Sequence, residues 1–400
     1  MHADLIIVGA GMVGSTLALA LKDSGLNIIV VDRSPLAVTS FSAEQPFEPR
    51  VSALSIASQR ILERVQAWPG IVQRRVSPYS EMHVWDGSGT GKIDFSASSV
   101  HAEVLGHIVE NKIVQDALLE QLHKSEITLL AHSTVEQLRH SSDGWLMLLN
   151  DGREIRSPLV IAADGANSAI RSLTGCATRE WDYLHHAIVT SVRWEQAHQR
   201  TAWQRFTDEG PLALLPLQHQ DGKNWCSIVW SVPKEQAEKI MALDDAAFCA
   251  ALGQASEHRL GASLHAIPLR QRHAKRYVEP GLALIGDAAH SIHPLAGQGV
   301  NLGFLDAAVL AEVLLHALSR GENIASERVL SRFERRRMPE NLAMMAAMES
   351  FQHLFQADSL AVRWLRNSGL KMVDNLSQAK TLFVRQALGL GSNLPDLAQP

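Results

Sequence analysis

A glycine-rich turn near the start of the chain joins an apolar strand to a helix. Residues 5–8 are apolar enough for a buried strand, and a full G-x-G-x-x-G pattern follows, with Gly9, Gly11 and Gly14 as its glycines. In such a turn the first glycine allows a tight bend, the second lets a pyrophosphate approach the backbone, and the third lets the helix pack closely on the strand. Because the helix start also presents unpaired N–H groups to an anion, the turn predicts an α/β fold that binds a dinucleotide.

A second strand and an acidic residue extend this pattern. Residues 28–31 are apolar, and Asp32 follows them, 18 residues after Gly14. A carboxylate at this spacing accepts hydrogen bonds from the adenosine ribose of a bound dinucleotide. We interpret the uncharged run 5–21 as strand, turn and helix rather than a signal peptide or membrane span, because it contains glycines and lacks a basic start. Turn, spacing and acid together predict a Rossmann-like domain.

Two later apolar strands also end next to an acid and a glycine. The run 160–163 is followed by Asp164 and Gly165, and the run 282–285 by a glycine and then Asp287. The carboxyl ends of strands are where open α/β sheets bind ligands. Each pair taken alone is as consistent with an ordinary turn as with a ligand site.

The residues after Asp287 form a glycine-containing loop at 294–299 that leads into an apolar helix, which we expect over 300–318. The start of that helix would direct N–H groups and the positive end of its dipole at a ligand in front of it.

These motifs in this order resemble the class A flavoprotein monooxygenases, the p-hydroxybenzoate hydroxylase-like family. The longest of them, from Gly286 to Gly303, is similar to the ubiquinone-biosynthesis hydroxylases. So are the stretches that begin at Arg50 (RVSAL), His107 (HIVEN) and Ala163 (ADGANS). The resemblance extends from residue 5 to about residue 390.

Three short motifs indicate which branch of this family the chain resembles. Residues 82–86 and 384–390 are most similar to the 2-polyprenylphenol (2-octaprenylphenol) C5-hydroxylases, whereas residues 201–207 look more like the neighbouring quinol hydroxylases. The resemblance therefore favours hydroxylation at C5 of a polyprenylated phenol in ubiquinone biosynthesis. It leaves another ring position open.

By this resemblance the chain binds FAD. The residues that it implies for the cofactor are Gly9, Gly11, Gly14, Asp32, Arg50, Asn111, Asp164, Gly165, Asp287, Gly297, Gln298, Gly299 and Asn301. In the family the glycine turn holds the pyrophosphate, and Asp32 and Asp287 occupy the positions that bind the adenosine ribose and the ribityl side. Arg50 would reach the pyrophosphate or ribityl region, and Asn111 stands where relatives often have a flavin-contacting glutamine. The helix start at Gly299 would face the flavin edge, where two-electron reduction leaves negative charge.

The resemblance further implies O2 and a reduced donor, NAD(P)H or another electron donor, as co-substrates. In that family, reduced flavin and O2 would form a C4a-hydroperoxide, whose distal oxygen the electron-rich phenol ring would attack. The protein binds and orients the ring and excludes water. Two alternatives of other classes share the fold: a flavin reductase or dehydrogenase acting on an isoprenoid, and a non-enzymatic flavin-carrying scaffold.

Candidates for the catalytic groups are His293, Pro294 and His186. His290 is a further histidine of the right type to act as a base at the phenol. For each histidine, a hydrogen-bonded structural role is the more common alternative. We expect no metal, because His290 and His293 precede a proline and lack a third ligand.

We expect an interleaved domain organisation. The FAD-binding domain would be assembled from residues 1–75, 101–180 and 270–330, the β-rich substrate domain from 76–100 and 181–269, and a C-terminal helical region from 331–400. Aromatic and apolar residues of the β-rich segments are candidates for pocket walls, although plain core is the more common role for any one of them. They are Trp203, Phe206, Leu214, Leu215 and Trp230.

The net charge of the chain is −5, which argues against a broadly basic, nucleic-acid-binding protein. This value is an average over parts of the chain that differ in charge. Residues 328–337 nevertheless hold five arginines against one glutamate, and residues 361–390 hold five basic residues against one aspartate. Interleaved with apolar residues, these stretches predict peripheral contact with an anionic membrane through 328–390, or helices packed with a solvated basic face.

The number and spacing of the cysteines indicate the redox compartment in which the protein works. The three cysteines are odd in number and in no C-x-x-C spacing. That excludes a disulfide framework and fits a reducing cytoplasm. We expect a cytoplasmic protein with peripheral membrane association, with other ubiquinone-biosynthesis proteins as candidate partners.

Overall fold

A six-stranded sheet contains the strand that precedes the glycine turn. The computed structural model describes residues 1–87, 89–194, 197–219, 221–222, 224–256, 260–262, 265–291, 299–356, 389, 391 and 393–400. The strands of this sheet, in spatial order, are β19 (Val278–Glu279), β20 (Leu282–Leu284), β12 (Leu159–Ala162), β1 (Leu5–Val8), β2 (Ile28–Val31) and β8 (Thr128–Leu130). All but β19 are parallel. Burial on both faces explains why β1, β2 and β12 are uninterrupted apolar runs.

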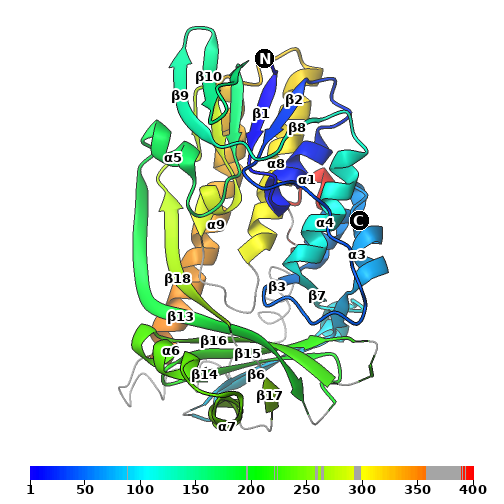
Figure 1. Ribbon diagram of the computed structural model, residues 1–400, viewed down its shortest axis with the longest axis vertical. Helices are drawn as coiled ribbons and strands as arrows, with labels where there is room; N and C mark the ends of the chain where they lie inside the picture. Colours follow the sequence, from blue (N-terminus) through cyan, green and yellow to red (C-terminus); the bar gives the residue numbers. More distant parts are fainter. Residues whose placement is uncertain are drawn as a thin grey trace.

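A nine-stranded, mainly antiparallel sheet forms the other half of the protein, in the lower part of Figure 1. Its strands, in spatial order, are β21 (His290–Ser291), β18 (His265–Ala274), β13 (Thr178–Trp194), β16 (Asn224–Pro233), β15 (Gly210–Leu217), β14 (Thr201–Thr207), β5 (Glu81–Asp86) and β6 (Lys92–Ser96), with β17 (Leu260–Ala262) beside β13. The long strands β13 and β18 continue upward toward the six-stranded sheet and so connect the two halves (Figure 1).

The remaining strands of the described residues form two three-stranded sheets. One consists of β3 (Val51–Leu54), β7 (Gly106–Glu110) and β4 (Ser77–Tyr79), and the other of β11 (Glu154–Ser157), β10 (Gly144–Leu149) and β9 (Val135–Ser141).

The helices of the cofactor half pack on one another around the six-stranded sheet. They are α1 (Met12–Ala20), α2 (Ile56–Arg64), α3 (Trp68–Arg74), α4 (Asn111–His123), α5 (Ala169–Thr174), α8 (Gly299–Ser319) and α9 (Glu327–Gln356). Helix α1 contacts α4 and α8, and α8 contacts α9. Helices α6 (Lys234–Met241) and α7 (Asp245–Ser256) lie against the large sheet, and short 3-10 turns occur at η1 (Ala97–Val100), η2 (Gly286–Ala288) and η4 (Asp396–Ala398).

Among the described residues, α8 is the one helix long and apolar enough to span a membrane by length and composition. In this protein 67% of its most apolar window is buried inside the fold. Packing against α1, α2 and α9 therefore accounts for its composition.

The strand and helix predictions are confirmed in the cofactor half. Strands β1 and β2 have the predicted bounds, β12 and β20 lie within one residue of theirs, and α8 extends the predicted helix by one residue at each end. Two proposed domain boundaries instead fall inside strands. The boundary at 180–181 cuts β13, and the boundary at 269–270 cuts β18, because these two strands belong to both halves.

The five candidate pocket walls are core residues. Trp203 is half-buried against the core of the large sheet. The other four are almost fully buried: Phe206, Leu214, Leu215 and Trp230. Their burial favours the plain-core interpretation.

Four of the five arginines at 328–337 form ion pairs. Their partners are Glu322 for Arg328 and Arg332, Glu312 for Arg336, and Asp306 for Arg337. Arg337 is even among the largest fully buried side chains of the described residues. Three acids that precede this stretch in the chain thus compensate part of its positive charge, and membrane contact through it stays a prediction. The second basic stretch, 361–390, lies outside the described residues except for Gly389.

Candidate active site

The three glycines of the turn differ in what a side chain at each position would meet. Gly9 has a φ of +105°, and a Cβ there would overlap the carbonyl oxygen of Ala163. A Cβ at Gly14 would overlap the carbonyl oxygen of Gly9. At Gly11, which precedes the first residue of α1, a Cβ would meet nothing within 4 Å. Packing thus requires Gly9 and Gly14, while Gly11 borders open space in front of the helix start.

Asp32 lies beside this turn at the end of β2. Its Oδ2 accepts a hydrogen bond from the N–H of Ala10 at 2.6 Å, and its Oδ1 accepts one from the N–H of Ser34 at 2.7 Å. Because each carboxylate oxygen has two lone pairs, the half-buried side chain retains capacity to accept from ribose hydroxyls. The structure therefore brings Asp32 to the glycine turn, as the spacing predicts.

Arg50 and Asn111 are neighbours through the pairing of β3 with β7. The N–H of Asn111 donates to the carbonyl of Arg50 at 2.9 Å, and the hydroxyl of Ser52 donates to Asn111 Oδ1 at 2.6 Å. The Arg50 side chain is exposed. It lies close enough to Asp287 to act electrostatically on that carboxyl.

Asp287 is an exposed acid in η2, directly after β20. Desolvation by the surrounding protein raises the pKa of its carboxyl, an effect that His290 and then Arg50 partly oppose. A crowded acid beside a guanidinium suits hydrogen bonding to hydroxyl groups of a bound ligand.

Arg171 bridges the two distal motifs, a role that sequence reasoning missed. The Nη1 of this buried guanidinium donates to the carbonyl of Ala288 at 2.8 Å, and its Nη2 donates to the carbonyl of Ala166 at 2.6 Å. It thereby fixes the Asp164 turn against the Asp287 turn. Its position a few residues after the acid–glycine pair was visible in the sequence, but no pattern indicated its targets.

Asp164 retains an unused acceptor in this arrangement. Its Oδ2 accepts a backbone N–H at 3.2 Å, whereas its Oδ1 is buried and no described residue hydrogen-bonds to it. The following Gly165 has a φ of +84° and faces open space. A buried carboxylate oxygen without a partner is costly unless a ligand or water satisfies it.

The side chain of Asn301 hydrogen-bonds to other residues of the protein. Its Oδ1 accepts from the N–H of Ser55 at 3.0 Å and from the hydroxyl of Ser58 at 2.7 Å, and its Nδ2 donates to the carbonyl of Ala53 at 2.8 Å. The amide therefore fixes the start of α8 on β3 and α2. The assignment of Asn301 to the cofactor site therefore stays a prediction that concerns its backbone rather than its amide.

Four of the remaining predicted site residues lie outside the described residues: His293, Pro294, Gly297 and Gln298. Gly299 begins α8, as expected for a residue at the helix start.

The two described histidine candidates do not meet. His186 is half-buried in β13, where the pairing with β18 is irregular. His290 is buried, and its Nε2 lies 2.5 Å from Asp306 Oδ2. This contact and the burial favour the structural role for His290 over that of a base at a phenol. Among the described residues, no group of three histidines, cysteines or acids is suited to hold a metal.

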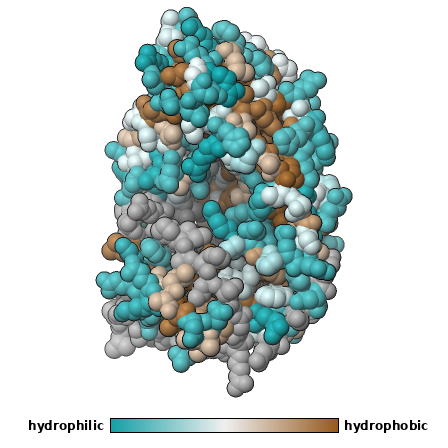
Figure 2. Space-filling model, viewed as in Figure 1, coloured by the Kyte–Doolittle hydropathy of each residue, from teal (hydrophilic) through white to brown (hydrophobic). Residues whose placement is uncertain are grey.

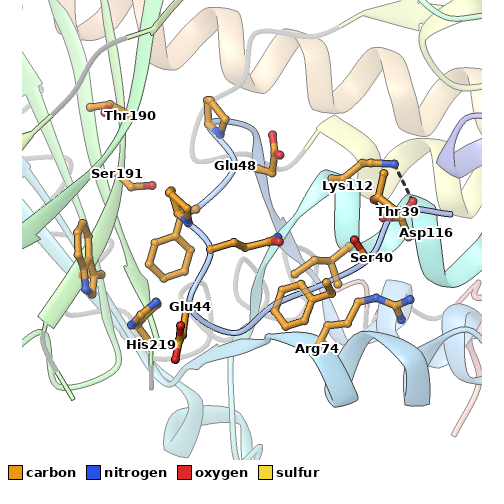
Figure 3. A pocket seen from close by; sticks show the side chains of 17 residues that line it. Thr39, Ser40, Glu44, Glu48, Arg74, Lys112, Asp116, Thr190, Ser191 and His219 are labelled. Atoms are coloured by element: carbon orange, nitrogen blue, oxygen red, sulfur yellow. Dashed lines mark hydrogen bonds and ion pairs between the residues drawn. The ribbon is translucent and has the colours of Figure 1, made fainter. Parts of the chain in front are cut away.

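A cavity of about 690 Å³ opens between the cofactor half and the large sheet (Figure 3). Hollowing between the two halves is also visible on the face shown in Figure 2. The residues that line the cavity are Thr39, Ser40, Phe41, Glu44, Gln45, Pro46, Phe47, Glu48, Pro49, Arg74, Lys112, Ile113, Asp116, Thr190, Ser191, His219 and Trp225.

Aromatic rings and a free hydroxyl distinguish its walls. The Phe47 ring lies 5.5 Å from that of His219 and 5.8 Å from that of Trp225, measured between centroids. Ser191 of β13 directs its hydroxyl toward the cavity, and no described residue hydrogen-bonds to that oxygen (Figure 3). Lys112 is held by Asp116 at 2.7 Å, so its charge is compensated.

The geometry fits a dinucleotide cofactor. Open space at Gly11 gives a phosphate access to the helix start. The Oδ1 of Asp164 has no partner among the described residues, so it can accept a hydrogen bond from a ligand. Arg171 holds together the Asp164 and Asp287 turns, which lie at the carboxyl ends of β12 and β20.

Comparison with known proteins agrees with this geometry. A family described as "FAD binding domain" matches residues 2–348. The chain is 37% identical over 392 residues to the 3-demethoxyubiquinol 3-hydroxylase of Escherichia coli (strain K12), covering 97% of this chain and 98% of that protein. It is 34% identical over 405 residues to the ubiquinone hydroxylase UbiL of Rhodospirillum rubrum, covering 99% and 92%.

Solved structures show the same fold. PqsL, a probable FAD-dependent monooxygenase from Pseudomonas aeruginosa, has a TM-score of 0.75 at 24% identity and covers 93% of this chain and 100% of its own. The p-nitrophenol 4-monooxygenase PnpA from Pseudomonas putida has a TM-score of 0.75 at 20% identity, covering 98% and 99%. The chain is thus an FAD-dependent oxidoreductase that belongs to the class A flavoprotein monooxygenases, within the family of the ubiquinone-biosynthesis hydroxylases.

Proposed function

We propose that this protein hydroxylates the aromatic ring of a polyprenylated phenol or quinol, with O2 and a reduced nicotinamide donor as co-substrates. One oxygen atom of O2 enters a ring C–H bond, and the other leaves as water. The donor supplies a hydride, and the medium supplies a proton. The observation that supports this most is the 37% identity along nearly the whole length of the Escherichia coli 3-hydroxylase.

The chain's own residues hold the cofactor in this proposal. FAD, when bound, transfers the donor's electrons to O2. The start of α1 at Gly11 binds the pyrophosphate, and Asp32 accepts from the adenosine ribose. Asp287 and Arg50 hold the ribityl and pyrophosphate side, and the start of α8 at Gly299 stabilises negative charge on the reduced ring.

The cavity beside the large sheet is the proposed place of the substrate. Its volume of about 690 Å³ suits an aromatic ring with a short length of isoprenoid chain. The rings of Phe47 and Trp225 provide apolar contact, and Ser191 of β13 lies in the same wall. Pro49, which lines the cavity, immediately precedes Arg50, so the cavity begins beside the proposed cofactor site. A long prenyl tail exceeds this volume and must extend through an opening.

Isotope labelling tests the reaction class. The reduced holoenzyme is mixed with ¹⁸O2 and a short-chain polyprenylphenol, and we expect one ¹⁸O atom in the ring of the product. A saturated isoprenoid product formed without O2 would instead support the reductase alternative. Absence of any substrate turnover, with FAD bound and reducible by NADH or NADPH, would favour the scaffold.

The cofactor assignment has a separate test. Asp287→Ala should purify with little or no yellow flavin, since the ribityl side loses its acceptor. Full retention of FAD would reject the role proposed for Asp287, whatever the outcome of the labelling experiment.

Two ring positions are candidates, each on its own observation. Residues 82–86 and 384–390 favour C5 of the 2-polyprenylphenol. Similarity to the Escherichia coli protein, together with residues 201–207, favours the position on which that 3-hydroxylase acts. Deletion of the gene distinguishes them: accumulation of the 2-polyprenylphenol supports C5, and accumulation of a demethoxyubiquinol supports the other position.

A further inference from the structure

We infer that Asp306 is a positioning residue for the FAD site, because its carboxylate holds both ends of the segment that contains Asp287. Asp306 lies on α8 and is fully buried. Its Oδ2 accepts from the N–H of Gly286 at 3.0 Å and from Nε2 of His290 at 2.5 Å. These two residues flank Asp287 on either side. The inference rests on the proposed role of Asp287 in binding FAD.

The other oxygen of Asp306 connects this segment to α9. Its Oδ1 accepts from Arg337 Nε at 2.8 Å and from Asn341 Nδ2 at 3.2 Å. Arg337 is also buried, and its Nη2 donates to Asn341 Oδ1 at 2.8 Å and to the carbonyl of Leu302 at 3.4 Å. One buried carboxylate thus joins η2, β21, α8 and α9 at a single point.

The Asp306 carboxylate is ionised in this environment. Burial raises its pKa, but the neighbouring His290 and Arg337 outweigh burial and lower the pKa well below its usual range. All four acceptor positions of the carboxylate are occupied by protein donors, from Gly286, His290, Arg337 and Asn341. Asp306 therefore has no capacity left for a ligand, and any effect on FAD must pass through the segment it holds.

The segment around Asp287 and the helix α8 both pack closely against the glycine turn. A Cβ at Gly286 would lie 3.1 Å from Val13 Cγ2, and a Cβ at Gly303 would lie 2.5 Å from the same atom. Val13 is the second residue of α1, inside the glycine turn. Asp306 follows Gly303 by one turn of α8. A shift of the Asp306 contacts would therefore move the Asp287 segment relative to the pyrophosphate site.

The test compares FAD affinity with fold stability in the full-length protein. We expect Asp306→Asn to raise the Kd for FAD at least tenfold, measured by titrating apoprotein with FAD and following flavin fluorescence. Because Asp306→Asn removes the buried counter-ion of Arg337 and leaves it only the more exposed Glu340, the double variant Asp306→Asn/Arg337→Met is measured as well. It removes both charges, and its Kd should rise to a similar extent.

Glu312→Gln is the matched control. Glu312 also lies on α8 and binds Arg336 of α9 at 2.5 Å, but it has no contact with Gly286 or His290 among the described residues. We expect its Kd for FAD to stay within twofold of the wild type. Wild-type affinity in the double variant, or an equal loss of affinity in Glu312→Gln, would overturn the inference.

A double-mutant comparison with Asp287→Ala separates the inference from the proposed function. If Asp306 acts through Asp287, Asp306→Asn should raise the Kd for FAD much less in the Asp287→Ala background than in the wild type. An undiminished effect in that background overturns the inference alone. Wild-type affinity in Asp287→Ala itself rejects the assignment of Asp287, and the inference with it.

Discussion

The guanidinium of Arg75 binds the carboxylate of Glu110 through two hydrogen bonds, from Nε to Oε2 at 2.8 Å and from Nη2 to Oε1 at 3.0 Å. Both side chains are buried. The same pair anchors the wall of the cavity: the N–H of Glu48 donates to Glu110 Oε1 at 2.8 Å, Arg75 Nη1 donates to the carbonyl of Gln45, and the Arg75 guanidinium lies 4.0 Å from the centre of the Phe47 ring.

Breaking this pair should destabilise the protein and loosen the cavity wall. We expect Glu110→Gln to lower the free energy of unfolding by about 3–5 kcal/mol, because it leaves a buried guanidinium without a counter-ion. It should also raise KM for the phenol. Denaturant unfolding and steady-state kinetics measure the two effects. Glu120→Gln, which breaks the more exposed pair with Arg74, should cost less than about 1 kcal/mol. Equal losses in the two variants would contradict the role of the buried pair.

Two glycines of the turn should respond differently to alanine. Gly14→Ala introduces a methyl group where the Gly9 carbonyl lies, so we expect the apoprotein to lose about 1–3 kcal/mol of unfolding free energy. Gly11→Ala finds open space, and Gly11 has a backbone that alanine adopts. It should leave apoprotein stability nearly unchanged and raise the Kd for FAD at least tenfold. An unchanged Kd in Gly11→Ala would show that no phosphate approaches this position.

The substrate cavity is tested at Ser191. Ser191→Leu should raise KM for the polyprenylphenol severalfold by filling part of the cavity, with the Kd for FAD unchanged. Ser227→Ala is the control, since Ser227 pairs with Ser191 across β13 and β16 and also has a buried hydroxyl without a partner, yet it does not line the cavity. A normal KM in Ser191→Leu would place the substrate elsewhere.

His273 should make the protein sensitive to mild acid. Burial, followed by the charges of His290 and Arg179, lowers the pKa of His273 to about 4, below the 6.5 expected in the unfolded chain. The unfolded state therefore binds the proton first, so stability is full above pH 6.5 and falls as the pH drops toward 4. By linkage this loss amounts to at most about 3 kcal/mol. Urea unfolding of His273→Gln at several pH values should show a flatter profile, with exposed His316→Gln as the substitution control.

We propose membrane contact through the basic stretch 361–390. Replacing Arg363, Arg366 and Lys371 by glutamine should reduce binding to vesicles of anionic phospholipid, measured by flotation, because their charges attract the surface. Replacing Arg332, which is paired with Glu322, should not. Equal binding to anionic and uncharged vesicles by the wild type would reject the proposal.

Local patterns predicted those parts of the fold that depend on neighbouring residues. The strand, glycine turn and helix around Gly9 are encoded within about fifteen residues, so their bounds could be read directly. The same holds for the strand ends at Asp164 and Asp287. These features define the cofactor half because parallel strands buried on both faces have an unbroken apolar sequence.

Features that depend on distant partners could not be predicted. Arg337 stands in an arginine-rich run that looks solvent-exposed, and its partner Asp306 lies 31 residues earlier in an apolar helix. The first half of β13, from Thr178 to His186, is too polar for a strand signal, and it forms one because it pairs with β18. In both cases tertiary contact outweighs the local pattern.

The order of strands has a consequence for biosynthesis. β1 leaves the ribosome first, yet its neighbour β12 pairs Leu159 with Leu5, and β20 follows only at residue 282. Chains are made from the N-terminus, and such long-range pairing forms slowly. The nascent chain must therefore keep its first apolar strands from aggregating until β20, which ends at residue 284 of 400, has been synthesised. Stalled or truncated products would expose those strands, and FAD supplied during translation would find no complete site to bind.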